Sequence, residues 1–306
     1  MKLLHCINKI VIKNRHYFLF VFLSFVLLLA SCETETPVLV QDNKINGIIM
    51  SDKAMKLYSE VAALFGMPIT VKPISDLFEN TLNLGQMDFE SDKSSLTPLI
   101  EIDSVYGRTE STFTHELLHL KNRAMGFPHL ILYHYTNVYA ERYPTNHAEQ
   151  AKLDMALFVR IFDAVEHQLV FEQMKDLNIS NPKNDWIQGV KEFTSGGVLP
   201  ITNNRNNQIR YYFKNSLELP ILGYGDLMSS LKDAYTKRGW SDALTTSEAM
   251  VKIAKNYTPV TKDNILLAVT KAANLISPKS VQYEIINTTK RKSGNATITV
   301  CELLLK

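Results

Sequence analysis

The sequence predicts an α+β domain in which helices outweigh strands. Apolar residues recur at helical spacing over most of the chain, whereas alternating or β-branched runs are few and short. No long low-complexity linker and no internal repeat interrupts residues 46–306. We therefore expect one helix-rich domain over 46–306, with a small mixed sheet.

The first predicted elements alternate between helix and strand. Apolar residues between Ala54 and Leu64 recur at helical spacing, and Gly66 follows as a stop signal. The runs at 68–74 and 96–106 are short and apolar, which favours strands.

A second helix is predicted at 110–125. Ser111 or Thr112 is suited to cap its start, and Gly126 and Pro128 are suited to end it. The remaining expected elements are a long helix at 147–178, interrupted near its middle, an extended segment at 210–219, helices at 226–239 and 246–256, and a closing hairpin at 281–287 and 296–304.

The first residues have the pattern of an export signal rather than of the fold. Basic residues without any acidic one precede an apolar run of 13 residues at 18–30. That run is short for a bilayer span and typical of a signal-peptide core. The Leu29-Ala30-Ser31-Cys32 sequence that ends it resembles the lipobox of bacterial lipoproteins. This resemblance implies cleavage before Cys32 and acylation of that cysteine.

From these patterns we predict a chain of three parts. Residues 1–31 are a lipoprotein signal peptide, 32–45 are a polar tether, and 46–306 are the domain. We expect an exported cell-envelope lipoprotein, held on the outer membrane by a lipid at Cys32 and facing the periplasm or the cell exterior.

Charge and cysteine content argue against a nucleic-acid-binding protein and against a disulfide-bonded domain. The whole chain has 33 basic and 31 acidic residues; four of the basic ones lie in the signal, which leaves 29 against 31. A mature net charge of −2 gives no reason to expect a nucleic-acid partner. Without Cys6 and the lipidated Cys32, only Cys301 remains, so the domain has no internal disulfide.

The helix at 110–125 carries the sequence His-Glu-Leu-Leu-His. His115 and His119 are four residues apart, so both rings lie on one face of a helix and can bind one zinc ion. Glu116 stands beside the first histidine, where a carboxylate can act as the general base of a metallopeptidase.

This motif resembles that of HExxH zinc metallopeptidases of the zincin class. The resemblance covers about residues 100–180 and implies a zincin-like fold, hydrolysis of a protein or peptide substrate, and catalysis by metal-activated water. It also implies that a strand at 98–106 could bind extended substrate. The longer metzincin pattern is absent, because no His-x-x-Gly-x-x-His follows His119.

A catalytic zinc site needs a third protein ligand, and three residues of the long predicted helix are candidates. His167 is favoured, because it interrupts a strongly apolar run that should be buried. Asp163, four residues earlier, would then orient it. Glu166 is the rival, since it would complete the His-His-Glu set of gluzincins. Glu149 is the third option.

Two other functions stay open at this point. The protein could be a non-catalytic surface lipoprotein that uses a zincin-like domain for binding, in which case the third ligand would not converge on His115 and His119. It could also be a zinc hydrolase that acts on a non-peptide amide.

Overall fold

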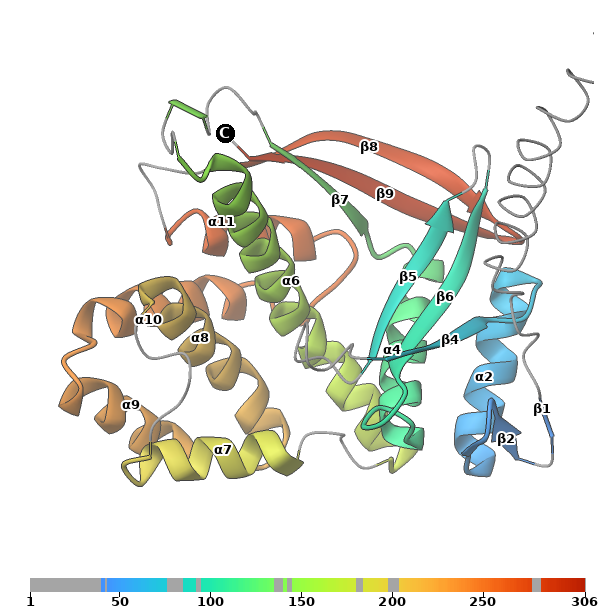
Figure 1. Ribbon diagram of the computed structural model, residues 1–306, viewed down its shortest axis with the longest axis horizontal. Coiled ribbons are helices and arrows are strands. Elements are labelled where there is room, and N and C mark those ends of the chain that lie inside the picture. The colour runs from blue at the N-terminus through green and yellow to red at the C-terminus, as the bar shows by residue number, and fades with distance from the viewer. Residues whose placement is uncertain are drawn as a thin grey trace, which may run out of the picture.

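The computed structural model describes residues 40–41, 43–75, 85–91, 95–134, 140–141, 145–179, 184–197, 204–276 and 282–305. Its architecture is α+β with helix in excess, as the sequence predicts (Figure 1). The helices are α2 (Asp52–Phe65), α4 (Glu110–Ala124), α6 (His147–Leu177), α7 (Asn184–Thr194), α8 (Arg205–Ile221), α9 (Leu227–Lys237), α10 (Ser241–Lys255) and α11 (Ile265–Ala273). The strands are β1 (Val40–Gln41), β2 (Lys44–Ile45), β3 (Ile48–Ile49), β4 (Thr70–Ile74), β5 (Gly85–Ser91), β6 (Leu96–Asp103), β7 (His129–His134), β8 (Tyr283–Ser293) and β9 (Ala296–Leu305).

The described strands form small sheets of three strands each. A short antiparallel sheet has the order β1-β2-β3. A mixed sheet has the order β4-β6-β5, in which β6 is parallel to β4 and antiparallel to β5. A second mixed sheet has the order β7-β9-β8, in which β9 is parallel to β7 and antiparallel to β8.

Helix α6 joins two hydrophobic cores. Its first half, up to Val165, packs into a core formed with α8, α10 and α11. Its last turns, from Val170 onward, pack into a second core formed with α2, α4 and the β4-β6-β5 sheet. In Figure 1, α6 runs between the orange helices and the teal strands. The change from one core to the other therefore falls between Val165 and Val170.

Most of the predicted elements are confirmed. Helices α2, α4, α9 and α10, strands β4 and β6, and the β8–β9 hairpin lie where the sequence places them. The long helix α6 continues without the predicted interruption. Helices α7 and α11 and strands β5 and β7 were not predicted. Ile45 is fully buried in the second core, so the fold begins before the predicted boundary at residue 46.

The extended segment predicted at 210–219 is wrong, because these residues belong to helix α8. Three consecutive aromatic residues at 211–213 have strong β propensity, which favoured a strand. Ile209, Phe213 and Leu217, however, recur every four residues and are all buried in the first core. Tertiary packing of that face outweighs the local propensity.

The predicted signal peptide and the lipidation site at Cys32 lie outside the described residues. Within the described part of the chain, no helix is both long and apolar enough to span a lipid bilayer.

The contact between the tight β8–β9 turn and the end of α2 gives a test of the fold. Gly294 has φ +53°, and a Cβ there would lie 1.9 Å from the Phe65 carbonyl oxygen at the end of α2. We expect Gly294→Ala to lower the free energy of unfolding by about 2–5 kcal/mol, through backbone strain and overpacking.

Gly189 is the matched control, because it lies within α7 and a Cβ there would have nothing within 4 Å. Gly189→Ala should raise the free energy of unfolding by about 0.5–1 kcal/mol. Urea unfolding of both variants measures the difference, and equal stabilities would contradict the described turn.

Candidate metal centre

Helix α4 carries the His-Glu-Leu-Leu-His sequence and is buried along most of its length. Its N-cap is Thr109 rather than Ser111 or Thr112: the Thr109 hydroxyl accepts a hydrogen bond of 3.1 Å from the Thr112 amide. The cap fixes the first turn, so the histidines one and two turns later project from one buried face.

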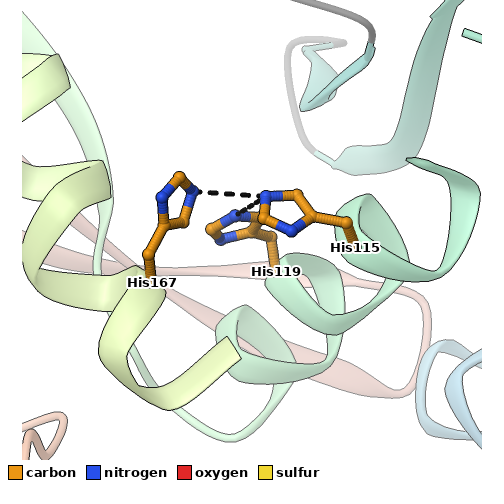
Figure 2. A group of neighbouring side chains, drawn as sticks. All are labelled: His115, His119 and His167. Atoms are coloured by element: carbon orange, nitrogen blue, oxygen red, sulfur yellow. Dashed lines mark hydrogen bonds between the residues drawn. The ribbon is translucent and has the colours of Figure 1, made fainter. Parts of the chain in front are cut away.

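Three histidine side chains converge between α4 and α6 (Figure 2). The Nε2 atom of His115 lies 3.2 Å from Nε2 of His119 and 3.2 Å from Nε2 of His167. Two nitrogens bound to one zinc ion at ~2.0–2.1 Å with tetrahedral geometry would be about 3.3 Å apart. The three buried histidines are therefore close enough together to bind one metal ion.

Carboxylates on the opposite ring nitrogens fix the tautomer of two of these histidines. Nδ1 of His119 lies 3.1 Å from Oε2 of Glu166, and Nδ1 of His167 lies 2.6 Å from Oε1 of Glu218. An ionised carboxylate only accepts hydrogen bonds, so each Nδ1 donates and each Nε2 directs a lone pair at the centre. A metal ion at the centre would accept both lone pairs, so the donor set fits a metal ion.

Glu166 is the centre of a buried ionic network rather than a member of the histidine cluster. Its two oxygens accept hydrogen bonds of 2.6 and 2.7 Å from Nη1 and Nη2 of Arg123. Asn122 donates to Oε1 at 3.3 Å. Burial alone would raise the pKa of the Glu166 carboxyl, but the charges of Arg123 and His119 hold it well below its usual range. Glu166, the rival candidate for the third ligand, thus contacts Nδ1 of His119, the ring nitrogen that points away from the histidine cluster.

Glu218 orients His167 and was missed by the sequence analysis. It is fully buried on α8 and also accepts a hydrogen bond of 2.8 Å from Lys214, one turn earlier. The Lys214 ammonium lies 5.2 Å from the centre of the Trp186 ring. The available signal was an acidic residue within the apolar sequence Leu217-Glu218-Leu219, the same kind of signal that pointed to His167.

Two other predicted candidates lie elsewhere. Glu149 is exposed near the start of α6, 18 residues before His167, which is about 27 Å along the helix axis. Asp163 is half-buried, and burial raises the pKa of its carboxyl. The orienting role predicted for Asp163 falls instead to Glu218, which contacts Nδ1 of His167.

Glu116 is buried beside the histidines, and its charge acts on the His119 ring. The strand predicted to bind extended substrate has no free edge, because β6 pairs with β4 on one side and with β5 on the other. That part of the expectation is wrong. In its sheet, β4 and β5 are the outer strands.

Neither family models, nor curated proteins, nor solved structures give a match to this chain. The geometry alone defines the class of site: a buried cluster of three histidines, in which Glu166 of α6 orients His119 and Glu218 of α8 orients His167.

The buried network gives a stability test. Arg123→Met would leave the Glu166 carboxylate buried without its main counter-ion, so we expect the free energy of unfolding to fall by about 3–5 kcal/mol. Lys121→Met, on the same helix, removes only the exposed contact of 3.3 Å with Glu60. It should change the free energy of unfolding by less than about 1 kcal/mol. Chemical denaturation compares the two, and similar losses would argue against a tightly coupled network.

Proposed function

We propose that the protein is a zinc-dependent metallopeptidase. The supporting observation is the convergence of the His115, His119 and His167 Nε2 atoms beside the buried Glu116. Three imidazoles are a known ligand set of catalytic zinc, and they leave the fourth coordination position for water or substrate. His167 is then the third ligand, and Glu166 and Glu218 hold two of the ligands in place.

The residues of the chain divide the chemistry between them. Zinc, when bound, supplies Lewis-acid polarisation of the substrate carbonyl and of a water molecule. The Glu116 carboxylate would accept a proton from the water that attacks the peptide carbonyl, and would return that proton to the leaving amine. Glu166 and Glu218 keep Nδ1 of His119 and His167 protonated throughout, so both Nε2 atoms stay directed at the centre.

The proposed setting is a cell-envelope lipoprotein of the outer membrane, facing the periplasm or the exterior, with a protein or peptide as substrate. It rests on the apolar run at 18–30 and the cysteine at its end. The first described strand begins at Val40, eight residues after Cys32, so a fully extended tether spans about 28 Å. A lipid at Cys32 would keep the domain close to the membrane surface.

Metal content tests the ligand set. We expect the wild-type domain to bind one zinc ion per chain. Glu218→Gln should weaken binding by about 10- to 100-fold, because it removes the group that orients His167. His167→Ala should weaken binding further, since a ligand itself is lost. Competition with a chromophoric chelator measures the affinities, and Glu149→Gln is the control. Wild-type affinity in His167→Ala would exclude His167 as a ligand.

Hydrolysis tests the role of Glu116. Glu116→Gln should retain zinc and fold but lose about 10²- to 10⁴-fold in peptide cleavage, since the amide cannot accept the proton. Mass spectrometry of a peptide library follows the cleavage. Unchanged cleavage would remove Glu116 from the mechanism. A zinc-loaded wild-type protein that cleaves no peptide would favour the alternative, a surface lipoprotein that binds a partner without catalysis.

A further inference from the structure

A chain of polar contacts leads from the histidine cluster into α8. Helices α6 and α8 pack against each other, and the fully buried Glu218 of α8 lies beside His167 of α6. One oxygen of Glu218, Oε1, lies 2.6 Å from Nδ1 of His167 and accepts a hydrogen bond of 2.8 Å from Nζ of Lys214. The chain therefore starts at the candidate ligand and ends at the lysine.

The pair formed by Lys214 and Glu218 differs from an ordinary ion pair on a helix surface. A pair four residues apart stabilises an isolated helix better when the glutamate comes before the lysine, and here the lysine comes first. In a surface pair both side chains are exposed, whereas the Glu218 side chain is fully buried. The lysine is therefore placed to serve the buried carboxylate rather than the helix.

Trp186 holds the lysine in place. A lysine side chain is long and flexible, so its ammonium stays at one position only if it has further contacts. The Lys214 ammonium lies 5.2 Å from the centre of the Trp186 ring, within the range of a cation–π interaction. Trp186 belongs to α7 and packs against an apolar cluster that includes Leu219, the residue after Glu218. Helices α7 and α8 thus hold the lysine on the carboxylate together.

The two orienting carboxylates are fixed in different ways. Arg123 donates to both oxygens of Glu166, at 2.6 and 2.7 Å, so this carboxylate is held in one plane on Nδ1 of His119. Lys214 is a point charge that contacts one oxygen of Glu218. The direction of the Glu218 carboxylate is therefore sensitive to where the lysine lies.

We propose that Lys214 is a positioning residue of the candidate metal centre: it fixes the Glu218 carboxylate on Nδ1 of His167, and Trp186 fixes Lys214. The affinity for zinc is then set in part from α7, a helix that supplies no ligand. This inference rests on the zinc site of the proposed function and deepens it.

Zinc affinity tests the proposal. Competition with a chromophoric chelator measures it for the full-length protein and its variants. Lys214→Met keeps an unbranched apolar side chain but removes the charge, Lys214→Arg retains the charge, and Trp186→Leu removes the aromatic face. Lys191→Met is the matched control. Lys191 also lies over a ring, 5.6 Å from the centre of Tyr224, but it is exposed and donates to no carboxylate in the described part of the chain.

We expect Lys214→Met to weaken zinc binding about 10-fold, the lower end of the range for loss of a group that supports a metal ligand. Trp186→Leu should weaken it about 2- to 5-fold, as for one lost cation–π interaction. Lys214→Arg should retain most of the affinity, and Lys191→Met should retain all of it. The double variant Lys214→Met/Glu218→Gln should bind no more weakly than Glu218→Gln alone, because the lysine acts only through that carboxylate.

A spectroscopic measurement separates positioning from a general loss of packing. The proton on Nδ1 of His167 gives an imidazole NMR resonance that moves when its charge-assisted hydrogen bond to Glu218 changes. In the zinc-loaded protein, we expect this resonance to move in Lys214→Met in the same direction as in Glu218→Gln, and to stay in place in Lys191→Met.

Wild-type zinc affinity in Lys214→Met would overturn the role of Lys214 and leave the peptidase proposal standing. Additive losses in the double variant, or an unmoved His167 resonance in Lys214→Met, would also overturn it, since the lysine would then act elsewhere. The expected affinities and resonance shifts in a protein that cleaves no peptide would support positioning by Lys214 and overturn the peptidase proposal.

Discussion

The geometry of the candidate site depends on one buried charge, the carboxylate of Glu166. An unpaired carboxylate in this position would cost several kcal/mol, so α6 must be rotated until Glu166 meets Arg123 and His119, which are one turn apart on α4. Successive helical residues are 100° apart. Once Glu166 faces Arg123, the next residue, His167, is turned toward His115. One ion pair thus fixes both the histidine cluster and the orientation of α6 relative to α4.

Hydrophobic packing holds α6 in this orientation from both ends. Val165 is fully buried in the core formed with the later helices, and Val170 is fully buried in the core formed with α2 and α4. Glu166 and His167 lie between these two anchors, at the junction of the cores. Rotation of α6 would disturb the packing of both cores, so the polar residues at the junction are kept in register by apolar contacts on either side.

Local patterns predicted the parts of this arrangement that depend on one helix. The spacing of His115 and His119 places both on one face wherever the helix lies, and the predicted bounds of α4 are nearly those observed. Such patterns could not decide whether Glu166 or His167 is the third ligand, because the answer depends on how α6 is rotated against α4. Glu218 was missed for a related reason: the aromatic run at 211–213 favoured a strand, and only packing against α6 makes α8 a helix.

The two orienting carboxylates, Glu166 and Glu218, differ in how exposed their counter-ions are. This difference distinguishes the His119 side of the site from the His167 side. Glu166 is neutralised by Arg123, whose side chain is 4% exposed, so the His119 side is closed. Glu218 is neutralised by Lys214, whose side chain is 25% exposed and extends along Trp186 toward solvent. The counter-ion on the His167 side is therefore the more exposed of the two.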